Sequence, residues 1–184
     1  LRLSASDGIL SSSDDITVVV KDAVVIESGQ IRVDYWYGIS GHNISSFTSL
    51  ASYPNSPDAS ATLDSFELPL QQADNFGARV TGLLRPQVSG AYTFWIAADD
   101  TSRLLLSTDE NDSNKVEIAK TSSWTPSRSW DMRAEQKSVA INLEAGKSYF
   151  VEGRMKEGAG GDNLSVAWEG PGISRAVIDG AYFS

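Results

Sequence analysis

Residues 91–98 read Ala-Tyr-Thr-Phe-Trp-Ile-Ala-Ala, and this stretch decides the fold class. Side chains of an extended strand point alternately to opposite faces, and here both alternating sets are mainly apolar. Such a strand suits the middle of a sandwich in which both faces of the sheet are covered. Ser89-Gly90 supplies a turn into it, and Asp99-Asp100 follows it. The sequence therefore predicts a buried strand that ends at two adjacent carboxylates.

Period-two patterns recur on both sides of this strand, and no stretch sustains the spacing of an amphipathic helix. Residues 164–169 alternate Leu, Val and Trp with Ser, Ala and Glu, which predicts one buried and one exposed face. Residues 139–143 and 149–154 alternate around the turn 144–147, which predicts two neighbouring strands. We therefore expect an all-β chain folded as an antiparallel β-sandwich. Further strands are expected at 78–84 and 103–107.

Long polar stretches predict surface loops. Residues 40–75 are rich in Ser, Asn, Pro and Asp, so little regular structure is expected there beyond one helical turn near 45–51. His42 lies among these residues and is expected to be exposed. Residues 108–114 are also expected to form a loop. A loop region as long as 40–75 usually covers the domain or takes part in binding.

Composition limits the classes of function. The formal net charge is −9, so the surface repels phosphate backbones and anionic membranes, and no nucleic-acid partner is expected. With no cysteine and one histidine, a thiolate or zinc site is not expected, whereas oxygen ligands for a divalent cation are abundant. No apolar run approaches a bilayer span, so no membrane insertion is expected. The profile suits an excerpt of a secreted protein.

Residues 1–22 differ in character from the rest of the chain. Two alternating stretches flank a glycine turn, enough to pair with each other but too short to enclose a core. They resemble the last hairpin of a PKD-like or related immunoglobulin-like extracellular repeat. We expect 1–22 to be the end of such a repeat or a linker, and 23–184 to form the main domain. An additional edge hairpin of the sandwich is the alternative.

Asp99-Asp100 is the first candidate site. Consecutive side chains of a strand point to opposite faces, so two adjacent carboxylates cannot normally hold one ion. A cis peptide between them would turn both side chains the same way, and we predict one here. A divalent cation would relieve the repulsion between the two charges. A solvated turn is the structural alternative.

Residues 157–163 form the second candidate site. Three glycines within Glu157-Gly-Ala-Gly-Gly-Asp-Asn163 permit a left-handed backbone that turns carbonyl oxygens toward one point, and Asp162 adds a carboxylate. Calcium takes 6 to 8 oxygens, so the two segments would supply about five and leave positions open for a ligand. A glycine-rich loop alone is often only a hairpin turn, so the combination of both segments carries the prediction.

Four ordered landmarks resemble the protective-antigen 14-kDa (PA14) domain family, and the resemblance runs from about residue 30 to residue 184. In flocculin-type and bacterial adhesin members, sugar hydroxyls bind directly to a calcium ion. The resemblance therefore implies a calcium-dependent lectin module of a secreted or cell-surface adhesin that binds terminal monosaccharides of cell-surface glycans or polysaccharides. It also implies an extracellular location and a monomeric module in a longer chain. The landmarks are Arg79–Pro86, Val88–Asp100, Leu143–Tyr149 and Gly160–Trp168.

The same resemblance implies which residues hold the Ca²⁺ ion. Asp99 and Asp100 match an aspartate pair joined by a cis peptide, and Asp162 stands where fungal members have asparagine. The carbonyl oxygens of Gly158 and Gly160 would complete the protein ligands. Glu157 and Trp130 are expected beside the sugar, together with the three acidic ligands. Trp124, Trp36 and Tyr37 are further aromatic residues that could stack on a sugar ring.

Other functions stay open at this point. A structural spacer would use the same metal residues but fill every coordination position with protein oxygens. The module could also be appended to a secreted glycoside hydrolase or another extracellular multidomain protein, because a fold does not by itself grant lectin activity. Glu67, Glu135, Glu152 and Glu157 could act in catalysis, but none lies in a catalytic motif, so no enzyme is predicted.

Overall fold

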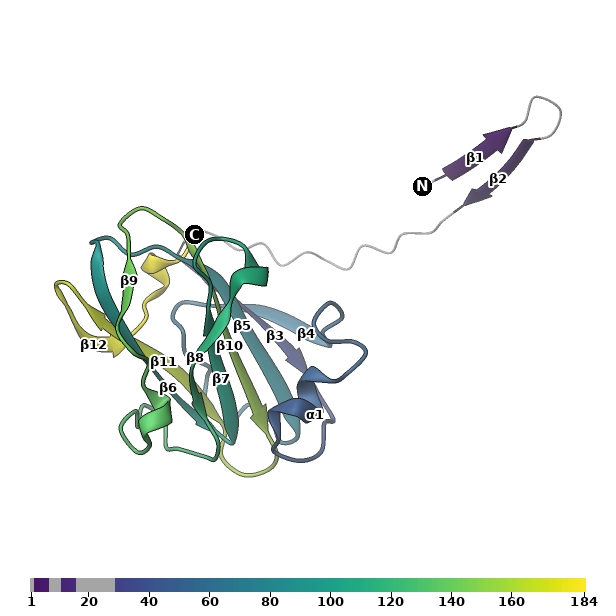
Figure 1. Cartoon of the computed structure of the whole chain (residues 1–184). Coiled ribbons are helices and arrows are strands. Elements are labelled where there is room, and N and C mark those ends of the chain that lie inside the picture. The colour runs from purple at the N-terminus through teal and green to yellow at the C-terminus, as the bar shows by residue number, and fades with distance from the viewer. Residues whose placement is uncertain (1, 7–10, 16–28) are drawn as a thin grey trace.

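The computed structural model describes residues 2–6, 11–15 and 29–184, and the last range forms a two-sheet sandwich (Figure 1). All pairings between its strands are antiparallel, which confirms the predicted fold class. One sheet has the order β4 (Ala59–Leu63), β3 (Ile31–Trp36), β5 (Phe76–Leu84), β10 (Tyr149–Glu157), β7 (Thr101–Leu106) and β8 (Val116–Thr121). The other has the order β12 (Ile173–Val177), β11 (Asn163–Gly170), β6 (Gly90–Asp99) and β9 (Ile141–Leu143).

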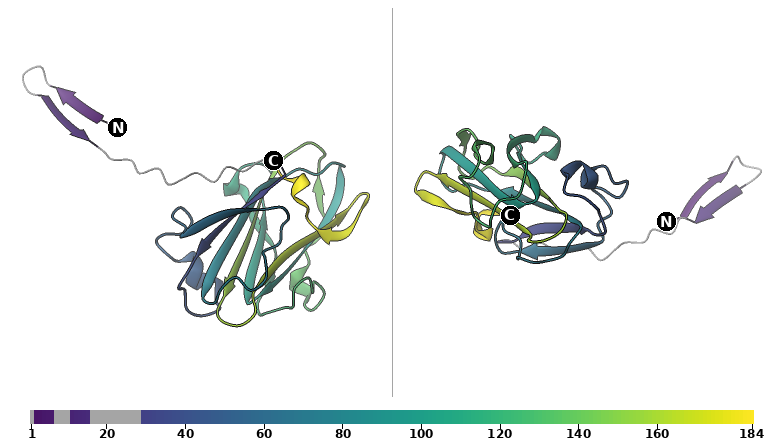
Figure 2. Two further views of the ribbon diagram at one scale, coloured as in Figure 1. Left: turned by 180° about the vertical axis from the view of Figure 1, so that it is seen from behind. Right: turned by 90° about the horizontal axis from the view of Figure 1, so that it is seen from below.

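The core lies between the two layers, which the views in Figure 2 show from two further directions. Strand β6 contributes Phe94 and Ile96, and its neighbour β11 contributes Val166 and Trp168. Opposite them lie apolar side chains of the larger sheet, including Val80 of β5. Removing this apolar surface from water is the main force that holds the layers together. The stretch 91–98 is therefore a central buried strand, as predicted.

The two strands that were predicted to pair across the turn 144–147 lie in different sheets. Strands β9 and β10 flank the turn 144–147, but β9 pairs with β6 while β10 pairs with β5 and β7. Both edges of β10 are thus occupied, so β9 joins the other layer and the turn is a crossover. The hairpin prediction was wrong for this reason. The Asp99-Asp100 junction is likewise a crossover, because β6 and β7 belong to opposite layers.

Strand β11 is buried on both faces from Asn163 to Trp168, whereas an exposed face was predicted. Ala167 lies opposite Trp95 in register, so the two share the outer face of the sheet. The guanidinium of Arg175 lies 5.1 Å from the centre of the Trp95 ring, and Lys137 Nζ lies 5.2 Å from it. Trp95, Arg175 and Lys137 thus lie on the face that carries Ala167, which the alternation alone predicted to be exposed to solvent.

The polar stretch 40–75 contains more regular structure than predicted. It includes β4, which pairs with β3, and helix α1 (Ile44–Thr48), which agrees with the expected helical turn. Phe47 of α1 packs against Trp36 at a ring-centre distance of 5.1 Å and against Tyr53 at 4.9 Å. Strand β4 was missed because its sequence, Ala-Ser-Ala-Thr-Leu, has little apolar alternation. Short 3₁₀ helices are Asp112–Asn114, Ala134–Gln136 and Gly180–Tyr182.

Strands β1 (Arg2–Ser6) and β2 (Ser11–Asp15) form the predicted N-terminal hairpin. Within the described residues they pair only with each other. Residues 1, 7–10 and 16–28 lie outside the described part, so the proposed boundary at residue 22 falls there and stays a prediction. At the start of the range 29–184, the Gly29 N–H donates to the carbonyl of Phe183, 3.3 Å away, which joins this point to the last residues.

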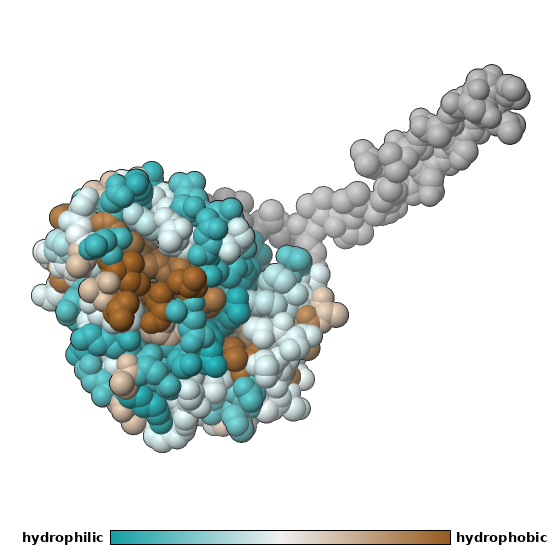
Figure 3. Space-filling model, viewed as in Figure 1, coloured by the Kyte–Doolittle hydropathy of each residue, from teal (hydrophilic) through white to brown (hydrophobic). Residues whose placement is uncertain are grey.

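An apolar groove of about 220 Å³ opens between the edge strands β8 and β9 and is visible as the brown hollow in Figure 3. Val116 and Ile118 line one side, and Ile141 and Leu143 line the other. Among the described helices, none combines the length and apolarity needed to cross a membrane.

Candidate metal centre

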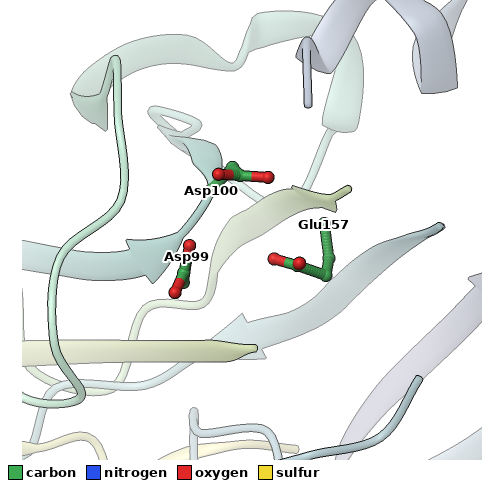
Figure 4. A group of neighbouring side chains, drawn as sticks. All are labelled: Asp99, Asp100 and Glu157. Atoms are coloured by element: carbon green, nitrogen blue, oxygen red, sulfur yellow. The ribbon is translucent and has the colours of Figure 1, made fainter. Parts of the chain in front are cut away.

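Three carboxylates converge at one corner of the sandwich, where the chain passes from one sheet to the other (Figure 4). Asp99 ends β6, Asp100 begins the crossover to β7, and Glu157 is the last residue of β10. Each offers one oxygen, and these oxygens all lie within 4.8 Å of one another. The Asp99-Asp100 peptide is cis, as the sequence predicted. Two strand ends and one crossover thus bring Glu157 to an aspartate pair that precedes it by 57 and 58 residues in the chain.

The glycine loop after β10 packs against Asp100. The Gly158 N–H donates to Asp100 Oδ2 at 3.0 Å, and a Cβ added at Gly158 would lie only 3.1 Å from the same oxygen. Gly160 has φ of +119°, a left-handed conformation that favours glycine. The loop and the aspartate pair therefore meet, as predicted. The predicted ligand oxygen of Gly158 also accepts a hydrogen bond from the Asn75 N–H at 2.7 Å, which uses one of its two lone pairs.

Asp162 anchors the far end of this loop. Its Oδ2 accepts from the backbone N–H groups of Gln72 and Ala73, at 2.6 and 3.1 Å. Its Oδ1 is buried without a hydrogen-bond partner. The charge of Asp162 also contributes to raising the pKa values of Asp99 and Glu157, so it acts on the same cluster. Asp74 secures the loop from outside, where its Oδ1 accepts from the Gly160 N–H at 3.1 Å.

Buried oxygens without partners concentrate at this corner. Glu157 is 0% exposed, and neither of its carboxylate oxygens has a hydrogen bond. Buried oxygens of this kind cost free energy unless a donor or a cation satisfies them. All the buried side-chain oxygens of the described residues that lack a partner lie between residues 157 and 165: Glu157 Oε1 and Oε2, Asp162 Oδ1, Asn163 Oδ1 and Ser165 Oγ.

The electrostatics of the corner disfavour ionised carboxylates in the absence of a cation. Burial, followed by the charges of Asp100 and Asp99, raises the pKa of Glu157 to about 8. Burial and the neighbouring Asp100 raise the pKa of Asp99 to about 6. The buried ammonium of Lys156 donates to the backbone carbonyl of Glu157 and makes no hydrogen bond with the Glu157 carboxylate. Its charge lowers the pKa of Glu157, but burial and the neighbouring aspartates outweigh it. An all-oxygen, strongly acidic donor set of this kind fits a hard divalent cation such as Ca²⁺.

The sequence predicted Glu157 beside a sugar and not among the metal ligands, and Asn163 was not among the predicted site residues. Asn163 lies opposite Asp99 in the β6–β11 register, and its Nδ2 donates to the Thr125 carbonyl at 2.9 Å. Its position directly after Asp162 was the available signal. The burial of Glu157 could not be read from the sequence, because it depends on contacts between segments that are distant in the chain.

Trp130 does not join the cluster. Its ring lies 5.8 Å from the guanidinium of Arg175, which also covers Trp95. Trp95 precedes Asp99 by four residues of strand, about 13 Å. Trp36 is buried in the cluster around α1, whereas Tyr37 and Trp124 are about half exposed. His42 is exposed, as predicted.

The other candidate glutamates are engaged elsewhere. Glu67 pairs with Arg128, with an N–O distance of 2.6 Å. Glu135 accepts from the Ser122 N–H at 2.8 Å. Glu152 is buried in an ion pair with Arg79 at 2.9 Å.

Comparison with known proteins assigns the family. The model of the PA14 domain matches residues 55–180, which is more than half of the chain. The chain belongs to the PA14 domain family. Mouse fibrocystin-L is 33% identical to this PA14 domain over 93 residues, 50% of the chain but only 2% of fibrocystin-L itself. The chain thus spans a very small part of that curated relative.

Two solved structures have the same fold. The PA14 sugar-binding domain from an RTX adhesin superposes with a TM-score of 0.65 at 15% identity, over 86% of this chain and 99% of the other chain. The A domain of Epithelial Adhesin 6 from Candida glabrata, in complex with Galβ1-3GlcNAc, superposes with a TM-score of 0.59 at 14% identity, over 88% of each chain. At these identities the likeness establishes the fold alone.

Proposed function

We propose that this PA14 domain is a calcium-dependent carbohydrate-binding module. The observation that carries the proposal is the buried, unpartnered carboxylate of Glu157 beside the aspartate pair. A buried carboxylate with no donor and two like charges nearby needs a cation to be stable as an anion. The corner lies at the end of the sandwich, where Asp99 and Asp100 are only partly buried, so a ligand could reach it.

Asp99, Asp100, Glu157 and Asp162 would hold the calcium ion, with the Asn163 amide oxygen and carbonyl oxygens of Gly158 and Gly160 as further donors. A bound calcium ion would offer its open coordination positions to two neighbouring hydroxyls of a sugar. The protein residues orient these donors: the Gly158 N–H positions Asp100, and the Gln72 and Ala73 N–H groups position Asp162. No proton transfer or bond cleavage is required of them, which suits binding and not catalysis.

The ligand class follows from this chemistry and is supported by the descriptions of similar domains. A rigid terminal monosaccharide presents vicinal hydroxyls without a large buried interface, so each contact would be weak and many copies would supply avidity. The two similar solved domains are described as belonging to adhesins. We place this module in a secreted or cell-surface adhesin that binds glycans. A module appended to a glycoside hydrolase is the alternative.

A glycan array probed in calcium and again in chelator tests the proposal. The lectin function predicts sugar binding that disappears with chelator and returns with added calcium. A spacer that uses calcium only for rigidity would gain thermal stability from calcium and bind no sugar in either condition. That pattern would reject the lectin function and retain the metal site.

The metal-free protein is expected to lose stability as the pH rises. The folded-state pKa values of Glu157, about 8, and Asp99, about 6, lie above the ordinary values of 4.5 and 3.8. Groups with raised folded pKa values bind more protons when folded, so the stability they contribute is full below the unfolded pKa and is lost as the pH rises through the folded pKa. Calcium would satisfy the ionised carboxylates, so it should raise the melting temperature more at about pH 8 than at about pH 5.

Differential scanning fluorimetry across this pH range, with and without calcium, measures the effect. An equal calcium shift at both ends of the range would contradict the assignment of Glu157 as a buried ligand.

A further inference from the structure

Four cationic residues stand side by side on the outer face of the larger sheet. The register places Arg79 of β5 directly opposite Arg154 of β10. Arg154 in turn lies opposite Arg103 of β7, which lies opposite Lys120 of the edge strand β8. Neighbours such as Val80 belong to the core, so the alternating cationic side chains point away from it. We call these four residues the basic row, which spans three strand spacings, roughly 14 Å.

The basic row is only partly neutralised by the protein. Like charges directly opposite one another on neighbouring strands are destabilising, so the row costs stability unless counter-charges or a ligand offset it. Two carboxylates serve the four cations, so a positive excess remains on a chain whose net charge is −9. Elsewhere on this face, Arg32 pairs with Asp34 at 2.8 Å. The counter-charges of the row are Glu152, which pairs with Arg79 and Arg154, and Glu117, which pairs with Arg103 and Lys120.

The donors of the row are held in place and are partly unused. The exposed fraction of the side chains rises toward the open edge of the sheet, from 15% at Arg79 to 38% at Lys120. The ring of Tyr53 lies 5.6 Å from the guanidinium of Arg154, whose two Nη atoms have no hydrogen-bond acceptor within the described part of the chain. Arg103 Nη1 donates to the Ser102 carbonyl at 2.8 Å, which fixes the group and leaves Nη2 available. Preorganised guanidinium groups with spare N–H donors are suited to receive an anion.

We propose that the basic row binds a linear polyuronate, a polysaccharide with one carboxylate on each sugar residue, without the help of calcium. A guanidinium matches a carboxylate with two parallel N–H···O bonds, and the row repeats such groups along a line. The small positive excess fits a sparsely charged chain. Nucleic acids and sulfated glycans carry more negative charge, and the net charge of −9 repels them more strongly.

This surface is separate from the calcium corner. Arg154 and Glu157 lie three residues apart on β10, so their side chains point to opposite faces of the sheet. The inference therefore does not depend on the proposed calcium-dependent function, and each can fail without the other.

Titration calorimetry with tetragalacturonate, in chelator and low salt, tests the inference. The chelator keeps calcium from the metal centre and from the uronate itself. The wild type should bind the charged tetramer, more weakly as salt rises, and should not bind its methyl ester, which has the same sugar chain without the charges. Arg154→Gln and Arg103→Gln should each lower the affinity roughly tenfold, because each removes a charge-assisted hydrogen-bonded contact.

Lys120→Gln and Lys147→Gln complete the set of variants. Lys120 lies on the edge strand, so its loss leaves the fold intact and should lower the affinity about threefold, as expected for one partly screened point charge. Lys147→Gln is the matched control, because Lys147 is an exposed lysine that pairs with Glu144 on another turn. It should bind the tetramer as the wild type does. Calcium affinity should be unchanged in all four variants.

Three results would overturn the inference. The first is the absence of tetragalacturonate binding by the wild type in chelator. The second is wild-type affinity in both arginine variants, or equal binding of the methyl ester, since either would show that the row does not recognise the carboxylates. The third is tighter binding of a heparin tetrasaccharide or of a short single-stranded DNA, which would assign the surface to a more highly charged polyanion.

Discussion

Asp100→Asn is expected to reduce calcium-dependent sugar binding below detection. One Asp100 oxygen receives the Gly158 N–H at 3.0 Å, and an oxygen of its carboxylate lies within 4.8 Å of ligand atoms of Asp99 and Glu157. Asparagine keeps the shape of the side chain but removes a full negative charge from the donor set. Calcium affinity depends strongly on the number of charged ligands, so a loss of at least a hundredfold is expected. Asp99→Asn should act in the same way.

Calcium titration, sugar titration and thermal melting together measure this effect. The metal-free variants should be no less stable than the wild type, because burial and Asp100 already disfavour the ionised form of Asp99. Glu144→Gln is the matched control, since Glu144 is an exposed carboxylate paired with Lys147 on another turn. Full sugar binding by both aspartate variants would remove the calcium lectin hypothesis.

Glu157→Gln is expected to change stability and calcium affinity in opposite directions. The Glu157 carboxylate is 0% exposed, has no hydrogen-bond partner and lies beside two aspartates. A neutral amide removes the repulsion and can donate to those aspartates, so the metal-free melting temperature should rise. Calcium affinity should fall at least tenfold, because a charged ligand is lost.

The calcium-induced rise in melting temperature should therefore be smaller in Glu157→Gln, because the metal-free protein melts at a higher temperature and calcium binds more weakly. Calorimetry gives the affinity, and scanning fluorimetry gives the two melting temperatures. The pH dependence of the metal-free protein should also flatten, since the pKa of Glu157, about 8, accounts for the upper part of it. Wild-type calcium affinity in this variant would show that Glu157 is a buried structural residue outside the metal site.

Local patterns predicted the strands whose apolar alternation is strong. The stretch 91–98, which is apolar on both faces, and the alternating strands β5, β10 and β11 form where their patterns predicted them. The weakly alternating β4 was missed, because its pairing with β3 and not its own side chains makes it a strand. The exposed face expected for β11 is covered by Trp95, Arg175 and Lys137, which come from other segments.

The candidate site was predicted in its parts but not in its geometry. Adjacent aspartates at a strand end required a bent backbone to act together, and the glycine loop offered a backbone that could approach them. Trp130 was expected beside the sugar, yet Arg175 lies over both its ring and that of Trp95, which places it beside Trp95.

The sequence alone predicts the strands with strong apolar patterns, the acidic and cysteine-free chemistry, and the two segments that could bind a cation. These properties depend on neighbouring residues, whose alternation and charge are visible in one dimension. Two features of the site are visible only in the tertiary structure: the Asp99-Asp100 junction joins opposite sheets, and Glu157 is buried beside it without a hydrogen-bond partner. Both features depend on which strands pair and which side chains cover one another. Contacts between residues that are distant in the chain decide this, and a local sequence pattern does not contain them.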